Sequence, residues 1–196
     1  MRLYSYVIDH DLGFAPNPFF RVCSLACCKP QIRKFAKEGD FVIGTGSTTG
    51  PAGRHLVYWM QINRILTFDQ YWRAPEYFRK RPILSGSDIQ RYGDNIYCVD
   101  RTTNEWVQED SFHSGTKKVE NLKRDTGATD RVLLGETFAY WGGEGPELPQ
   151  EFQNFVHIGV GHSVGRFKPA DVQVFSQWLL NRPERGCLSN PTDWEH

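Results

Sequence analysis

The sequence has no uninterrupted apolar run of about 18 residues, the length that a membrane-spanning helix requires. Its first residues include Arg2, Asp9 and Asp11, where a secretory signal would place an apolar stretch. A mean hydropathy of −0.52 and a charged fraction of 23% point the same way. We therefore expect a cytoplasmic protein that makes no membrane contact.

Cysteine is too sparse and too irregularly spaced for a metal site. Cys23, Cys27 and Cys28 cluster without a second paired set, and Cys98 and Cys187 have no cysteine or histidine beside them at ligand spacing. An odd number of cysteines without an export signal indicates reduced thiols. We predict no metal and no cofactor. A catalytic use of Cys28 stays open, without support from its sequence neighbours.

Motifs of the common enzyme classes are missing as well. The chain contains no P-loop, HExxH, GxSxG or paired zinc motif, and Gly159, Gly161 and Gly165 lack the βαβ unit of a dinucleotide site. These absences lower the expectation of an enzyme and favour a binding protein.

The chain also lacks an excess charge of either sign. Residues 1–91 carry 13 Lys and Arg against 7 Asp and Glu, whereas residues 92–196 carry 10 against 16. Nucleic acid would contact the basic half, unless folding mixes the two halves in space. A net charge of zero disfavours non-specific binding to nucleic acid. Any nucleic acid should therefore be bound through a pocket.

Apolar periodicity predicts a mixture of strands and short helices. Proline at a first helical position predicts a short amphipathic helix from Pro30, with Arg33 on its solvated face, and a final helix from Pro169. Thr67 and Gln70 form a capping box that predicts a third helix. Residues 117–130 are polar enough for a surface loop. We expect strands at residues 3–8, 41–43, 56–66, 106–112, 132–140 and 155–160.

Seven short segments of the sequence are characteristic. They are GFAPNPFF (13–20), CKPQIR (28–33), GDFVIGTGS (39–47), ILTFDQYW (65–72), YGDNIY (92–97), QEDSFHS (108–114) and GGEGPELP (142–149). These segments resemble a bacterial and phage family, the second nucleotide modification-associated domain family. The order of elements is also similar to the EVE and ASCH branches of the PUA-like superfamily. The resemblance covers roughly residues 2–180.

The resemblance implies an α+β fold with a PUA-like curved mixed sheet or partial barrel, peripheral helices and one long polar insertion. We expect one domain over residues 1–181 and a polar tail over 182–196, with little order unless Trp194 docks. The implied function is recognition of a nucleotide or modified base, free or in nucleic acid, in a modification or defence system. An enzyme acting on nucleotides or modified nucleic acid is the alternative, and a pure interaction module is a third interpretation.

Rings next to amides and glycine-rich backbone are the features that a base pocket needs, because a base is held by its flat face and by its edge. An aromatic content of 14% supplies the rings, although large rings are also ordinary core residues. The loop at residues 44–53 would bring backbone N–H groups close to the ligand. The candidate base-binding residues are Asn17, Phe19, Thr45, Ser47, Trp59, Tyr71, Trp72, Asp94, Asn95 and Trp141.

The adjacent cations Arg79, Lys80 and Arg81 are candidates for phosphate binding, with a solvated face as the alternative. If the protein is an enzyme, His113, Glu109 and Asp94 are the acid-base candidates, because a carboxylate beside a histidine suits proton transfer. Such residues also commonly satisfy the backbone of a loop.

Overall fold

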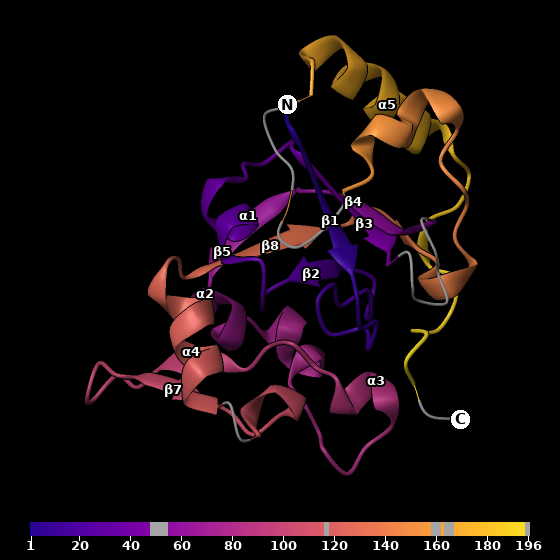
Figure 1. Ribbon diagram of the computed structural model, residues 1–196. Helices are drawn as coiled ribbons and strands as arrows, with labels where there is room; N and C mark the ends of the chain where they lie inside the picture. Colours follow the sequence, from indigo (N-terminus) through magenta and orange to yellow (C-terminus); the bar gives the residue numbers. More distant parts are fainter. Residues whose placement is uncertain (48–54, 116–117, 158–161, 163–166, 195–196) are drawn as a thin grey trace.

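A computed structural model describes residues 1–47, 55–115, 118–157, 162 and 167–194 (Figure 1). Its largest element is a mixed five-stranded sheet. The first two and the last two strands in spatial order pair in parallel, and the inner neighbours pair antiparallel. In that order the strands are β1 (Leu3–Ile8), β3 (Phe41–Gly46), β4 (Leu56–Gln61), β9 (Thr137–Tyr140) and β10 (Gly186–Cys187).

A second, antiparallel sheet packs against the larger one. It has the order β2 (Cys23–Leu25), β8 (Arg131–Gly135) and β5 (Arg64–Thr67). A separate hairpin is formed by β6 (Tyr97–Val99) and β7 (Trp106–Gln108).

Helices lie outside these sheets, α5 at one end of the molecule and α2 and α4 at the other (Figure 1). The α-helices are α1 (Pro30–Phe35), α2 (Phe68–Arg73), α3 (Asp88–Arg91), α4 (Lys118–Gly127) and α5 (Pro169–Asn181). The 3-10 helices are η1 (Pro75–Lys80), η2 (Phe112–Ser114), η3 (Gly142–Glu144) and η4 (Gln150–Phe155).

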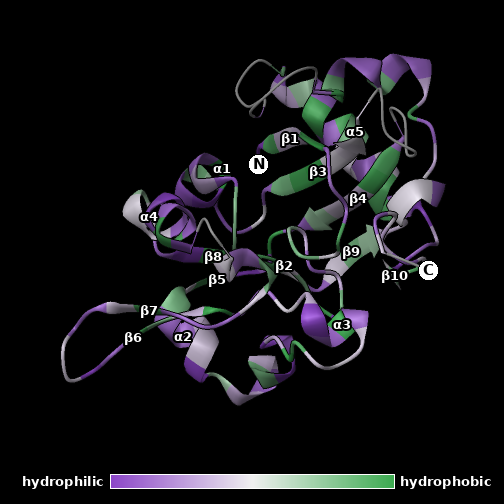
Figure 2. Ribbon diagram, turned by 60° about the horizontal axis from the view of Figure 1, so that its bottom comes forward, coloured by the Kyte–Doolittle hydropathy of each residue, from purple (hydrophilic) through white to green (hydrophobic). Residues whose placement is uncertain are grey.

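The core is divided between the faces of the two sheets. One face of the large sheet packs under η4 and α5, where Trp59, Phe155 and Phe175 are completely buried. Its other face packs on the small sheet through Tyr6, Tyr58 and their neighbours. Hydrophobic residues accordingly colour the central strands in Figure 2, whereas α4 is largely hydrophilic. Burial of this apolar surface, about 25 cal/mol per Å², is the main favourable term of folding.

Local sequence signals place three of the helices as predicted. The hydroxyl of Thr67 accepts from the backbone N–H of Gln70 at 3.1 Å, and the Gln70 side chain accepts from the Thr67 N–H at 2.8 Å, which completes the capping box of α2. Pro30 and Pro169 open α1 and α5. Their missing N–H groups cost nothing in the first turn of a helix.

Five expected elements differ from the structure. The strands expected at 56–66 and 132–140 are each divided in two, because β4 and β9 belong to the large sheet whereas β5 and β8 belong to the small one. The polar segment 117–130 contains helix α4, because Leu122 packs against the core and Asp125 is buried where the helix contacts α1 and η2. The expected strand at 106–112 ends at Gln108, and Phe112 opens η2. Of the strand expected at 155–160, the structure describes residues 155–157. These residues are not a strand, because Phe155 ends η4.

The α+β prediction is confirmed at the level of a mixed architecture. Within the described ranges none of the sheets closes into a barrel. The curved sheet or partial barrel stays a prediction. The PUA-like assignment stays a prediction. No helix in the described part of the chain has the length and apolar character needed to cross a membrane.

The polar tail is docked. Its strand β10 adds to the edge of β9. The indole Nε1 of Trp194 donates to the Leu12 carbonyl at 3.0 Å, and its ring stacks on Phe19 with centroids 5.6 Å apart. This docking fixes the loop between β1 and β2.

Candidate functional site

Lys80 is the centre of a fully buried polar network. Its Nζ donates to the carbonyl of Asn17 at 2.9 Å, to Oδ1 of Asn17 at 2.8 Å and to Oγ of Ser24 at 2.9 Å. Ser24 in turn donates to Oδ2 of Asp94 at 2.6 Å, and the Tyr71 hydroxyl donates to Oδ1 at 2.9 Å. The serine hydroxyl thus bridges a buried cation and a buried carboxylate.

Burial opposes both charges in this network. It lowers the pKa of Lys80 and raises the pKa of Asp94, while the opposite charge of each acts on the other in the stabilising direction. All three Lys80 protons have protein acceptors, which compensates for much of the lost hydration. The network therefore has a structural role.

Most of the residues expected to bind a base lie inside the core. Phe19 stacks on Trp194, and Trp59 stacks on Phe41 with centroids 6.1 Å apart. Of the glycine-rich loop, residues 48–54 lie outside the described residues, and Ser47 is half-buried. Trp72 is also half-buried. The completely or almost completely buried members are Asn17, Phe19, Thr45, Trp59, Tyr71, Asp94, Asn95 and Trp141.

The three adjacent cations separate in the structure. Lys80 points inward and is completely buried, so the expectation that it binds phosphate together with its neighbours is not met. Arg79 and Arg81 lie along a surface groove of about 620 Å³ that also includes Phe20 and Phe78. The Arg81 guanidinium lies 3.7 Å from the ring centroid of Trp72, and that of Arg79 lies 4.4 Å from the Phe20 centroid. We call this surface the arginine groove.

A different concavity combines rings with reactive side chains. It has a volume of about 540 Å³ and lies between β1, the loop after it, the start of α1 and η2. We call it the β1 cavity. Its walls carry Tyr6, Phe14, Phe112 and His113, and its polar groups include Asp9, His10, Cys28, Lys29 and Asp193. Glu109 and Asp94, the carboxylates expected to act with His113, are not among the lining residues.

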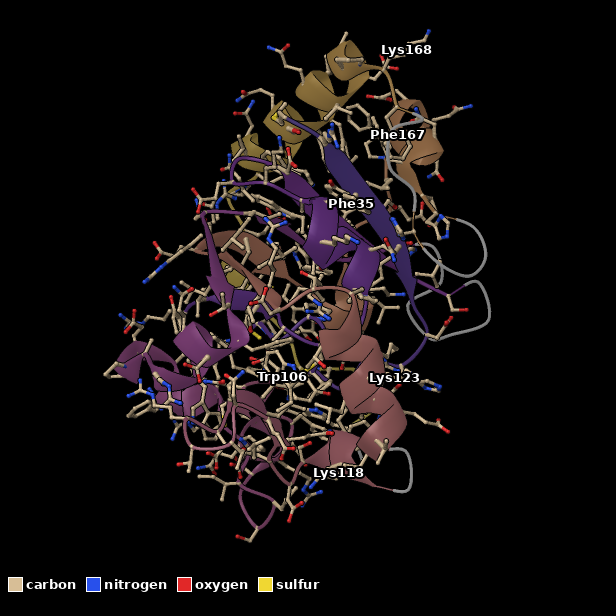
Figure 3. The ribbon with its side chains drawn as sticks, turned by 90° about the vertical axis from the view of Figure 1, so that its left-hand side faces the viewer. Phe35, Trp106, Lys118, Lys123, Phe167 and Lys168 are labelled. Carbon is tan, nitrogen blue, oxygen red and sulfur yellow. The ribbon has the colours of Figure 1, made fainter. Side chains whose placement is uncertain are left out.

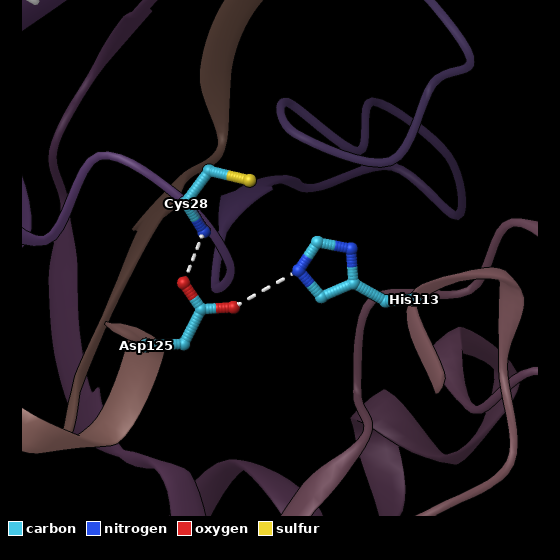
Figure 4. Close-up of side chains that lie close together, drawn as sticks. All are labelled: Cys28, His113 and Asp125. Carbon is cyan, nitrogen blue, oxygen red and sulfur yellow. Dashed lines mark hydrogen bonds and ion pairs between the residues drawn. The ribbon is translucent and has the colours of Figure 1, made fainter. Parts of the chain in front are cut away.

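Cys28 and His113 meet beside the buried carboxylate of Asp125 (Figure 4). The Cys28 backbone N–H donates to Oδ1 of Asp125 at 2.9 Å, and Nε2 of His113 lies 3.3 Å from Oδ2. The sulfur, one imidazole nitrogen and one carboxylate oxygen all lie within 4.8 Å of one another. Cys28 and Lys29 have positive φ angles of 59° and 41°, a strained conformation for residues other than glycine.

Asp125 is held by cations from two helices. Arg33 of α1, which the sequence placed on a solvated face, is completely buried and donates to the Asp125 carbonyl at 2.7 Å, and its Nη2 lies 3.9 Å from Oδ1. Arg124 of α4 donates from Nε to Oδ1 at 3.1 Å. Burial alone would raise the pKa of Asp125, but hydrogen bonds from His113 and Arg124 and the charges of Arg124 and Arg33 lower it overall. The carboxylate is therefore ionised.

Cys28, His113 and Asp125 form a group of potential metal ligands within the described part of the chain. Their surroundings do not fit a metal ion, because the carboxylate is already shared by two guanidinium groups and by the Tyr97 hydroxyl at 3.0 Å. A divalent ion would have to displace these cations or bind beside them, at a large electrostatic cost. The absence of a metal stays a prediction.

Sequence spacing gave little indication of this cluster. Cys28 and Asp125 are 97 positions apart and belong to elements whose contact depends on the buried Arg33. The sequence makes His113 a candidate with other partners, and it leaves a catalytic Cys28 open without support from its neighbours. The local signal is a cysteine two residues before the proline that opens α1.

Comparison with known proteins returns one family. Its profile, described as nucleotide modification associated domain 2, matches residues 1–196. Neither a curated protein nor a solved structure matches the chain.

Lys80→Ala should destabilise the protein by about 3–5 kcal/mol, because it leaves Asp94 as an uncompensated buried charge. The exposed neighbour supplies the matched control, since Arg79→Ala should change the free energy of unfolding by less than about 0.5 kcal/mol. Urea unfolding of both variants measures the difference. Equal stability of the two variants would contradict the structural role of Lys80.

The lowered pKa of Asp125 predicts a specific acid sensitivity. Because the pKa is lower in the folded than in the unfolded state, its contribution to stability is present above the ordinary value of about 3.9 and is lost as pH falls through the folded pKa. Arg124→Gln removes one cause of the lowering, so the variant should lose less stability than the wild type as pH falls, and its loss should be complete at a higher pH. Unfolding curves between pH 2 and pH 6 test this. A stability difference between the proteins that is constant over that range would argue against it.

Proposed function

The chain belongs to the nucleotide modification associated domain 2 family, and from this premise we propose that it binds a nucleotide or modified base, free or in nucleic acid, in the β1 cavity. The description of this family associates it with nucleotide modification, which supports the proposal. Binding of the modified or modifiable base is the activity that this cavity supports best.

The observation that carries the proposal is the aromatic wall of the β1 cavity. Phe14 and His113 lie with ring centroids 4.9 Å apart, and Phe112 packs edge-on against Phe14 at 6.3 Å. Phe112 remains 51% exposed, so one of its faces is available to a ligand. The volume of about 540 Å³ is within the range of small-molecule sites. A planar base stacking on such a ring gains about 1–3 kcal/mol.

Polar groups at the rim provide the directional contacts that a base edge or a phosphate needs. Lys29 lines the cavity with its ammonium 4.5 Å from the Tyr6 ring centroid, and partial burial lowers its pKa. Asp9 and Asp193 add acceptors on the same rim. A base with both donors and acceptors on its edge finds complementary groups there.

The arginine groove is the part of the surface best suited to a nucleic-acid backbone. Arg79 is exposed, and the half-buried Arg81 lies with its guanidinium 4.1 Å from the ring centroid of Phe78, so the groove combines positive charge with a ring. We assign to it the phosphate contacts of a strand whose base enters the β1 cavity. Free nucleotides would use the cavity alone.

Phe112→Ala should weaken binding of free nucleosides and nucleotides by about 1–3 kcal/mol, or about 5- to 150-fold, because it removes the exposed stacking face. Phe35→Ala is the matched control, since Phe35 is 52% exposed on the outer face of α1 (Figure 3). Calorimetric titration against a panel of bases, nucleotides and modified oligonucleotides provides the measurement. Equal affinities of the two variants, or no binding by the wild type to any member of the panel, would refute the proposal.

Replacing Arg79 and Arg81 together by alanine should weaken oligonucleotide binding and leave free nucleotide binding unchanged. The slope of log affinity against log salt should become shallower by about 0.7–0.9 for each lost phosphate contact. Fluorescence anisotropy measures this slope at salt concentrations from about 50 to about 300 mM, a range that includes physiological ionic strength. An unchanged slope in a folded double variant would show that the groove is only a solvated face.

A further inference from the structure

We propose that Cys28 is a catalytic nucleophile of the β1 cavity, with His113 as its proton acceptor and donor, acting on an electrophilic sp² carbon of a bound base or of an acyl group attached to it. This inference rests on the proposed base-binding function for the identity of its substrate. It makes the protein an enzyme that forms a covalent intermediate.

The first support is location. Cys28 and His113 both line the β1 cavity, which places both residues beside a ligand bound there. The other cysteines differ: Cys23, Cys27 and Cys98 are buried, and Cys187 is exposed on the edge strand β10.

The second support is the arrangement of charges around the imidazole. Nε2 of His113 lies 2.5 Å from Nη2 of Arg124 and 3.3 Å from Oδ2 of Asp125. A neutral ring accepts a hydrogen bond from Arg124, and a ring protonated at Nε2 donates one to Asp125. Both protonation states thus have a partner in place, which is what a group that repeatedly gains and loses a proton requires.

The third support is a cation beside the sulfur. The same Nη2 of Arg124 lies 3.7 Å from Sγ of Cys28. As the thiol proton passes to Nε2, this guanidinium loses its acceptor on the ring and can turn toward the thiolate. Arg124 is 43% exposed, which gives it the freedom to move, whereas Asp125 is completely buried and acts as a positioning residue.

The thiol is neutral at rest, since burial and the charge of Asp125 raise the pKa of Cys28, and the smaller effects of Arg124 and Lys29 do not reverse this. Attack therefore needs the histidine. The Sγ–H bond breaks, the proton moves to His113, an Sγ–C bond forms, and the π electron pair of the attacked carbon moves to its oxygen, nitrogen or conjugated carbon. That atom then takes the proton from His113. No oxidant, reductant or second substrate enters this addition, and its reversal restores the thiol.

Iodoacetamide tests the nucleophile independently of the natural substrate. It forms an Sγ–C bond with loss of iodide, and the thiol proton passes to His113. In the wild type at neutral pH, peptide mass spectrometry should find Cys28 alkylated faster than Cys187, which is exposed but whose pKa is raised to about 11, mainly by desolvation from its neighbours. His113→Gln should slow alkylation of Cys28 about 100-fold, within the usual range for general base catalysis. It should leave the rate at Cys187 unchanged.

The pH profile separates a proton-transfer role from a structural one. In His113→Gln the alkylation of Cys28 should follow the titration of the thiol itself, above the ordinary value of about 8.5, whereas the wild type should react well below it. Identical rates and pH profiles of the two proteins would overturn the proposal. A stoichiometric zinc ion in the purified protein that disappears in Cys28→Ser would also overturn it, because the thiol would then be a metal ligand.

Protection distinguishes this proposal from the proposed function. Saturating nucleoside monophosphates that bind in calorimetry should shield Cys28 from iodoacetamide. If Cys28 is reactive and dependent on His113 but unprotected, the nucleophile stands and the placement of the base in the β1 cavity fails. If nucleotides bind but wild-type Cys28 is alkylated as slowly as Cys28 in His113→Gln, the proposed binding function is retained and the proposal of a nucleophilic Cys28 is refuted.

Discussion

Two buried cations set the conditions for the rest of this structure. Lys80 and Arg33 are both completely buried, and removing such a charge from water costs several kcal/mol unless its hydrogen bonds are replaced. The Lys80 network joins the loop after β1, strand β2, helix η1 and the segment before β6. These segments cannot shift separately without exposing a charge to an apolar environment. The network therefore fixes the half of the molecule that holds the arginine groove.

The Arg33 network does the same for the β1 cavity. Arg33 donates to backbone carbonyls of Cys28, Arg131 and Asp125, and so joins α1, β8 and α4. The carboxylate of Asp125 then holds the Cys28 backbone and approaches the His113 ring. The stability of the fold and the geometry of the site are therefore coupled. The hydrogen-bond partners that compensate the buried charge of Arg33 also orient the thiol and the imidazole. We expect substitutions in this network to affect stability and reactivity together.

The sequence predicts an element correctly where the signal lies within a few neighbouring residues, and it does not predict contacts between distant segments. The capping box of α2 and the prolines of α1 and α5 each lie within one helical turn. The candidate base-binding residues do not form one surface, because aromatic rings and amides are as common in a protein core as in a binding site. Asn17 and Asp94, for example, are buried in the hydrogen-bond network of Lys80. Helix α4 was missed because its few apolar residues are spaced among charges. The contact of Cys28 with Asp125 has no periodic or spacing signal at all.

Burial removes these two cations from the surface of the basic first half, but Asp11 and Asp40 of the same half are almost completely buried as well. Among the residues that the structure describes, burial therefore leaves the positive excess of this half unchanged. With a net charge of zero, long-range attraction of a polyanion is weak, and affinity has to come from short-range contacts. A cavity with an aromatic wall supplies such contacts, and the arginine groove adds a few charges beside a ring. This distribution of charge favours recognition of a base by its shape and its hydrogen-bonding groups. The phosphate backbone of a nucleic acid would contribute little to the affinity.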